Sequence, residues 1–180
     1  PEYLNSWGAN NANALISLSQ VSETLCILLI PFFLKKFGIK KVMLLAMLAW
    51  VLRFGLFAVG NPGTGVWMFV VSMIVYGIAF DFFNVSGSLF VDKETDKKLR
   101  SSAQGVFMMM TNGFGATIGM IAAQYVVNHY VYSHTDVVQQ LEGWRTSWFI
   151  FAGYALVVTI LFAILFKYKH NPKDVENISH

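Results

Sequence analysis

The sequence has little charge and almost no cysteine. Only 13% of its 180 residues are charged, whereas a soluble domain usually carries about a quarter. Its single cysteine, Cys26, excludes an internal disulfide and has no Cys or His neighbour at metal-ligand spacing. Apolar residues make up 56% of the chain, and the mean hydropathy is positive. This composition excludes a disordered chain, argues against a water-facing globular domain and indicates a membrane protein.

The sequence also lacks the motifs of several enzyme classes. It has no GxxxxGKS phosphate loop, and no paired His and Cys spacing suggests a metal or haem. An intramembrane protease would need a Ser with a His, or two aspartates, at membrane depth, but the four histidines fall in predicted loops or the tail. Basic residues gather at segment ends rather than on one face, which argues against a nucleic-acid partner. We therefore expect no enzyme and no cofactor.

Five apolar segments are long enough to cross a bilayer, because about twenty helical residues span its roughly 30 Å core. The runs are continuous rather than alternating, which favours helices over a closed barrel. The predicted spans are 12–34, 42–59, 65–91, 102–127 and 147–166. They form an all-α integral membrane domain over 12–169, with a segment 1–11 before it, a polar loop 128–146 and a tail 170–180.

The distribution of lysine and arginine predicts the orientation. Eleven of the thirteen basic residues lie after the first, third or fifth span, and only Arg53 and Arg145 do not. Because basic loops stay in the cytoplasm, we expect the N-terminal segment outside and the tail inside. Four tryptophans near the opposite ends fit an interfacial belt: Trp7, Trp67, Trp144 and Trp148.

Four polar residues are predicted to lie at one depth in the membrane. Glu23 and Arg53 are each twelve residues from a flanking lysine, Asp81 is eleven before Asp92, and Asn112 is twelve after Arg100. At about 1.5 Å per residue, each lies roughly 16 to 18 Å from the cytoplasmic boundary. A charge there costs about 2.5 to 3.5 kcal/mol on insertion scales, so partners or an aqueous cavity are expected.

Helical spacing groups these residues into faces. Gln20 and Glu23 share one face of the first span. In the third span Tyr76, Phe80 and Asn84 follow spacings of four, and Asp81 adjoins them. Flat rings beside a carboxylate suit a flat, hydrogen-bonding solute.

Arg53 has two interpretations. It could pair with Glu23 or Asp81, or its long side chain could extend to the outer interface. One base against two acids leaves an odd carboxylate, which would prefer a proton or a ligand. This odd acid indicates transport.

Several runs in the chain form a recognisable pattern. The runs are Ser17–Leu25, Ile30–Lys40, Tyr76–Gly87, Ser102–Gly105 and Met109–Gly115. They closely resemble the C-terminal half of bacterial nucleoside:proton symporters of the major facilitator superfamily. The similarity covers nearly all of 13–170.

The resemblance implies twelve helices in two six-helix halves, of which this chain would supply helices eight to twelve, with the solute between the halves at mid-membrane. It further implies that Gln20 and Glu23 contact the nucleoside, that Tyr76 and Phe80 line or stack on it, and that Asp81 binds sugar or carries the coupling proton. Expected partners are a purine or pyrimidine nucleoside, protons, the lipid bilayer and the first half of the same transporter. The expected location is the bacterial inner membrane.

Two other functions remain open from the residues. One is a facilitator-type carrier of another small polar solute, such as a sugar, which the aromatic face fits less well. The other is a structural membrane subunit, in which the polar residues only hold helices together.

Overall fold

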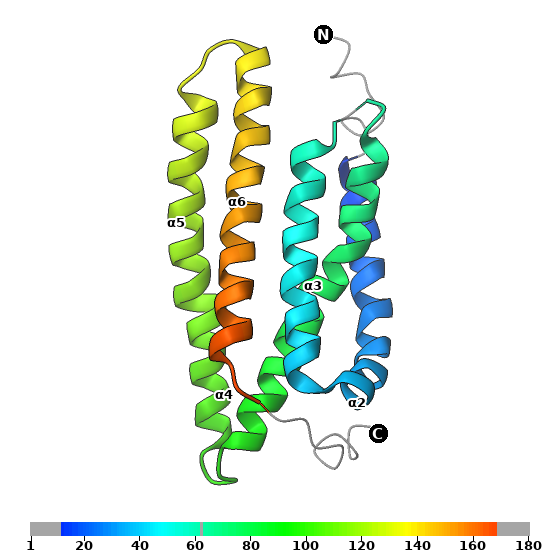
Figure 1. The fold of residues 1–180 in the computed structure, drawn as a ribbon, viewed down its shortest axis with the longest axis vertical. Coiled ribbons are helices and arrows are strands. Elements are labelled where there is room, and N and C mark those ends of the chain that lie inside the picture. The colour runs from blue at the N-terminus through cyan, green and yellow to red at the C-terminus, as the bar shows by residue number, and fades with distance from the viewer. Residues whose placement is uncertain (1–11, 62, 169–180) are drawn as a thin grey trace. The chain divides into compact units, whose positions relative to one another are not determined.

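The structure is a computed structural model, and it describes residues 12–61 and 63–168. The elements in chain order are α2 (Ala12–Val59), α3 (Val66–Glu94), α4 (Arg100–Met108), the π-helix η2 (Met109–Gly115), α5 (Ala116–Val127), the π-helix η3 (Asn128–Tyr132) and α6 (Val137–Leu165) (Figure 1). All elements in these residues are helical, so the predicted all-α class is confirmed. The segments predicted at 1–11 and 170–180 lie outside the described residues.

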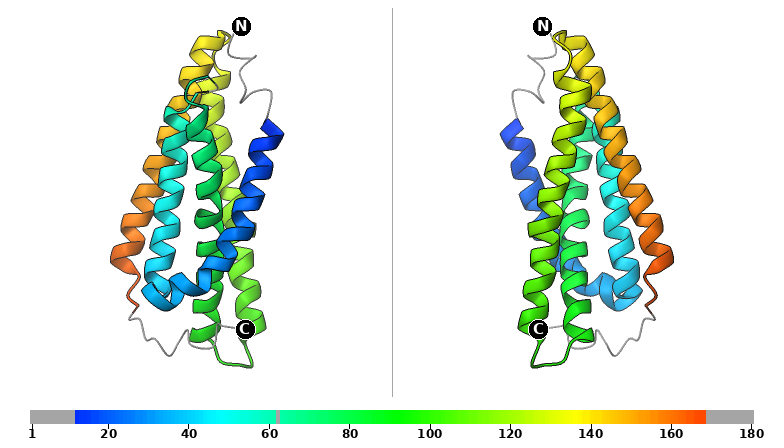
Figure 2. Two further views of the ribbon diagram at one scale, coloured as in Figure 1. Left: turned by 90° about the vertical axis from the view of Figure 1, so that its right-hand side faces the viewer. Right: turned by 90° about the vertical axis from the view of Figure 1, so that its left-hand side faces the viewer.

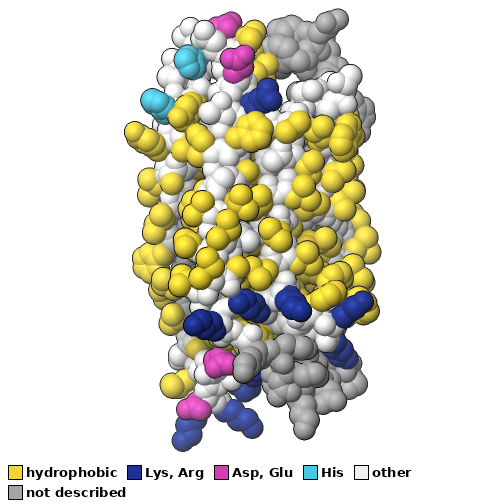
Figure 3. Space-filling view, in the orientation of Figure 1, with side chains coloured by type: hydrophobic (Ala, Val, Ile, Leu, Met, Phe, Trp, Pro, Cys, Tyr) yellow, Lys and Arg dark blue, Asp and Glu magenta, His cyan; other side chains and the backbone are white. Residues whose placement is uncertain are grey.

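Four helical stretches within the described ranges are long and apolar enough to cross a membrane: Ile16–Val59, Val66–Glu94, Arg100–Tyr132 and Val137–Leu165. Large apolar side chains along them are exposed, as lipid-facing residues are: Ile118 and Ile121 on α5 are 66% and 67% exposed. In Figure 3 hydrophobic side chains cover the middle of the helices, and Lys and Arg lie towards their ends. The count is four rather than five because the first stretch contains two of the predicted spans.

The predicted connection at 35–41 is present, but helical structure extends into it from both sides, so that it lies within the single element α2. The one interruption is Gly38, whose backbone has φ 76° and ψ 166°. A positive φ is strained for residues with a Cβ and open to glycine. The two arms of α2, before and after the bend, run antiparallel (Figures 1 and 2). Four flanking lysines made the segment look like a loop, but within it only Gly38 departs from helical geometry.

The predicted polar loop 128–146 is wrong over most of its length. Helical structure continues through η3 to Tyr132, and α6 already begins at Val137, so the connection is Ser133–Asp136. The Asp136 carboxylate accepts a bond from the Gln139 backbone N–H at 3.4 Å, which satisfies a free donor of the first turn of α6. Close packing continues beside the connection, because a Cβ on Gly143 would meet the Tyr130 carbonyl oxygen.

Residues Gly87–Ser147 form one compact unit, and the described residues on either side of them form the other. In this second unit the core surrounds the turn of α2, where Leu34 and Ile39 are fully buried. There the ring centroid of Phe33 lies 5.2 Å from that of Phe82 on α3. Small buried residues let the helices approach closely: Ala46, Ala49, Ala58 and Ala79. Lys40 Nζ also donates to the Ala163 carbonyl oxygen at 3.0 Å, near the end of α6.

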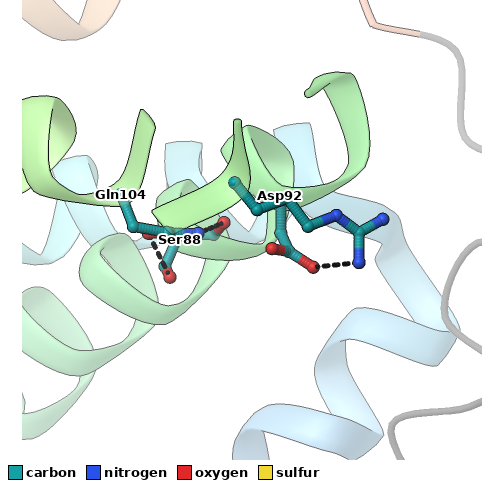
Figure 4. A network of polar contacts seen from close by, with 4 residues as sticks. Ser88, Asp92 and Gln104 are labelled. Atoms are coloured by element: carbon teal, nitrogen blue, oxygen red, sulfur yellow. Dashed lines mark hydrogen bonds and ion pairs between the residues drawn. The ribbon is translucent and has the colours of Figure 1, made fainter. Parts of the chain in front are cut away.

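In the unit Gly87–Ser147, the end of α3 is tied to the start of α4 by polar contacts (Figure 4). Ser88 Oγ donates to Gln104 Oε1 at 2.9 Å, and Gln104 Nε2 donates to the Ser88 carbonyl oxygen at 2.7 Å. Arg100 pairs with Asp92 at 3.2 Å. The helix α4 then continues into the wide turns of η2, which carry Thr111 and Asn112 near the middle of the stretch Arg100–Tyr132.

Candidate functional site

The first arm of α2 and α3 touch at backbone distance, and this contact brings the site residues together. A Cβ on Gly77 would lie 2.8 Å from the Ser22 carbonyl oxygen and 2.9 Å from the Glu23 backbone nitrogen. The Ser22 hydroxyl crosses the same gap and donates to the Ile74 carbonyl oxygen. Since Glu23 follows Ser22 and Tyr76 precedes Gly77, the crossing places the carboxyl group of α2 beside the aromatic face of α3.

Asp81 is the more buried of the two acids of this site. Its side chain is 9% exposed, and its Oδ2 is buried with no hydrogen-bond partner among the described residues. Asp81 and Glu23 interact electrostatically, so two carboxyl groups from different helices act on one another. A buried polar atom without a partner is uncommon and needs an explanation. A proton or a solute hydroxyl would satisfy it.

The aromatic face that the spacing predicted is present on α3. The rings of Tyr76 and Phe80 stack with centroids 5.7 Å apart and planes inclined by 19°. Phe80 is 38% exposed, so part of this residue is open to contact with a ligand. The Asn84 amide nitrogen donates to the Phe80 carbonyl oxygen at 2.9 Å, which leaves the amide oxygen as the group available to accept a bond.

Arg53 does not form the predicted ion pair with Glu23 or Asp81. Among the described residues it forms no ion pair, and its guanidinium lies between aromatic rings instead. Its Cζ is 4.3 Å from the centroid of the Tyr76 ring, 5.3 Å from Phe57 and 5.6 Å from Trp50. Arg53 also interacts electrostatically with Glu23. The side chain therefore lies against α3.

Gln20, Asn112 and Phe83 have other surroundings. Gln20 is exposed on the first arm of α2, one turn before Glu23, and its carbonyl oxygen accepts a bond from Thr24 Oγ1 at 3.1 Å. Asn112 belongs to η2 in the other unit. Phe83 lines a separate apolar cavity of about 240 Å³ with residues of α2 and α6: Met47, Trp50, Phe54, Tyr154, Ala155, Val158 and Thr159.

The sequence interpretation missed Trp50 and Gly77. The Trp50 ring meets that of Tyr76 edge-on, at 6.0 Å and 87°, and also contacts the Arg53 guanidinium. Trp50 lies three residues before Arg53, so helical spacing alone would have placed it on the same face. Gly77 gave no comparable signal, because a single glycine in a membrane helix is common.

Comparison with known proteins adds to this geometry. The model of the family described as "Nucleoside H+ symporter" matches residues 2–171. The chain belongs to this family. The resemblance read from the sequence motifs is therefore confirmed, together with an all-α integral membrane fold.

Individual relatives agree with the family. The chain is 49% identical to the nucleoside permease NupG of Escherichia coli (strain K12) over 183 residues, which are 100% of this chain and 42% of that protein. It is 48% identical to the xanthosine permease of the same strain over 178 residues, covering 98% of this chain and 41% of that one. A crystal structure of the nucleoside transporter NupG matches with a TM-score of 0.83 at 50% identity, covering 94% of this chain and 40% of that chain. The chain thus spans about two fifths of the length of these relatives.

Proposed function

We propose that the transporter containing this chain imports purine or pyrimidine nucleosides together with protons across the bacterial inner membrane. The observation that carries the proposal is the buried, unpartnered Oδ2 of Asp81 beside Glu23 and the stacked rings of Tyr76 and Phe80. A nucleoside offers a flat base for the rings and ribose hydroxyls for the carboxyl groups. A sugar would use the carboxyl groups but has no flat aromatic face to stack.

The roles follow from the contacts. Glu23 and Gln20 would hydrogen-bond the nucleoside from the first arm of α2, and the Asn84 amide oxygen would accept a bond from it. Tyr76 and Phe80 would stack on the base. Asp81 would take up the transported proton or bind a ribose hydroxyl, because its Oδ2 has no other partner in the described residues. A proton and a nucleoside bound side by side can then shift the transporter between its two conformations, provided that each binds one conformation better.

The rest of the site would come from the first half of the same transporter, because solutes of this class of carrier bind between the halves at mid-membrane. In the bilayer, the N-terminal segment of this chain would lie outside and the tail in the cytoplasm. A structural subunit would also tolerate polar side chains between helices, but it gives no reason for a carboxyl oxygen to be buried without a partner.

Transport by the full-length parent in proteoliposomes tests the proposal. We expect uridine and adenosine to accumulate when the outside is made acidic, and accumulation to stop when a protonophore dissipates the gradient. Galactose, supplied under the same conditions, measures the carrier alternative. Accumulation of galactose without nucleosides would favour a sugar carrier, and no accumulation of either solute would favour the structural subunit.

A further inference from the structure

Arg53 is a charged residue in the middle of a predicted span, and it is not among the residues proposed to contact the solute. Three aromatic rings surround its guanidinium, and the closest, Tyr76, is the ring proposed to stack on the base. Its NH1 group also approaches the Ser72 carbonyl oxygen of α3 at 3.5 Å, and Ser72 Oγ approaches the Arg53 carbonyl oxygen at the same distance. These contacts fix the second arm of α2 against α3.

The guanidinium also helps to fix the Tyr76 ring. Arg53 lies over one face of this ring, the Trp50 ring meets it edge-on, and the Phe80 ring stacks with it. A planar guanidinium stacks on an aromatic face in a way that a lysine ammonium does not reproduce. Loss of Arg53 would therefore leave Tyr76 free to change its rotamer, which weakens base stacking although Arg53 itself is not among the proposed solute contacts.

Three titratable groups surround Arg53 in its network of electrostatic interactions within the described residues. Tyr76 of α3 and Glu23 of the first arm of α2 interact electrostatically with Arg53, and Asp81 of α3 interacts with both of these groups. From α6, the neutral Trp148 belongs to the same group of contacts, since its ring stacks on that of Phe57 with centroids 4.8 Å apart. One arginine against two carboxylates leaves one net negative charge, and a single bound proton brings the set to neutrality.

We propose that Arg53 is a positioning residue of the solute site, which holds the Tyr76 ring for base stacking and supplies the charge that lets one proton neutralise the site. The inference rests on the proposed function. It explains why an arginine without an ion pair lies within a predicted membrane span. Its guanidinium contacts the Tyr76 ring, and its charge attracts the Glu23 carboxylate. Without this charge, the same two carboxyl groups would need two protons to reach neutrality in a medium that strongly disfavours charge.

The test uses the full-length parent with Arg53→Gln, Arg53→Lys and the control Lys36→Gln. Lys36 is a matched control because its Nζ also lies over two rings, Phe32 and Phe37, but at the turn of α2. Uridine affinity is measured by calorimetry, folding by thermal unfolding, and the pH dependence by uptake into proteoliposomes.

We expect Arg53→Gln to weaken uridine binding about tenfold. The pH profile of uptake should move toward alkaline pH, since carboxyl groups hold their protons more firmly once the positive charge beside them is gone. Arg53→Lys restores the charge and hence the wild-type pH profile, but its affinity stays lower because the planar stacking is lost. Lys36→Gln leaves both unchanged. A purely structural role for Arg53 would lower the unfolding temperature without moving the pH profile.

A folded Arg53→Gln transporter with the wild-type pH profile and affinity overturns the inference, and so does an Arg53→Lys profile displaced as far as that of Gln. If Arg53→Gln does not fold, Arg53→Met replaces it. If neither folds, wild-type uridine affinity in Arg53→Lys decides against the inference, and reduced affinity with an unmoved profile supports it. A wild-type parent that binds no uridine would instead refute the proposed function itself.

Discussion

The backbone of Gly77 lies against that of Ser22, so a Cβ on Gly77 would meet the Ser22 carbonyl oxygen at 2.8 Å. This contact sets the distance between the two helices that carry the acids of the site. Glu23 and Tyr76 are the immediate neighbours of the two residues in contact, and Asp81 follows one turn later on α3. The geometry of the candidate site thus depends on a residue without a side chain.

Gly77→Ala is expected to damage the site from a distance. The added methyl group meets backbone atoms that cannot rotate away, and overpacking of this kind costs about 1 to 3 kcal/mol. The helices would separate, which lowers the unfolding temperature and weakens nucleoside binding. Gly55→Ala is the control, because a Cβ there meets nothing within 4 Å. Equal behaviour of the two variants in thermal unfolding and calorimetry would show that the contact is not needed.

Glu23→Gln is expected to weaken nucleoside binding in the full-length parent while expression stays normal. A hydrogen bond to a charged group is worth about 1.5 to 3 kcal/mol, which corresponds to roughly a tenfold to hundredfold loss of affinity. Calorimetry measures the change, with Glu142→Gln, an exposed acid on α6, as the control. Unchanged affinity in a well-folded Glu23→Gln variant would remove Glu23 from the site.

Asp81→Asn is expected to abolish proton-driven accumulation, because an amide permanently resembles the protonated acid. Exchange of nucleoside down a gradient would persist if the amide still bonds the solute. Proteoliposomes with and without an imposed pH gradient separate the two activities, and Asp96→Asn, in an exposed turn, is the control. If the Asp81→Asn variant still concentrates nucleoside, the proton is carried elsewhere, and Glu23 becomes the next candidate.

The orientation is tested by accessibility to an impermeant thiol reagent. A cysteine at Asp96, between α3 and α4, is expected to be protected from the outside in intact cells, because the lysine-rich connections lie in the cytoplasm. A cysteine at Thr135, in the connection before α6, is expected to react. Both positions are exposed, so differences in burial do not confuse the comparison. The reverse labelling pattern would invert the topology.

Sequence reasoning predicted the helical class and the shared face of Tyr76 and Phe80. These properties depend on hydropathy and on periodicity along one helix, and both can be read from residue order. The connections were harder, because lysines and polar residues occur at helix ends as well as in loops. Nothing in the residues at 128–146 distinguished a polar loop from a helical pair packed at Gly143.

The arrangement of Arg53 illustrates a second limit. Its depth followed from counting residues, but the direction of its side chain depends on which helix lies next to it. The sequence offered an ion pair or the interface, and the structure shows three rings. Trp50 and Tyr76 come from different helices, so their meeting at the guanidinium is a property of helix packing that no local pattern contains.

The turn at Gly38 determines where foreign peptide can be inserted into this protein. Most connections in proteins lie on the surface and accept insertions, but Gly38 is buried and its neighbours Leu34 and Ile39 are fully buried. An epitope tag placed after Gly38 would have to pull this core apart, and we expect it to abolish production of folded transporter. The same tag after Thr135, where the whole connection Ser133–Asp136 is exposed, should be tolerated. Fluorescence-detected gel filtration of the two tagged parents would measure how much folded transporter each gives. The exposed connection before α6 is therefore the place to attach labels, antibody epitopes and fusion partners.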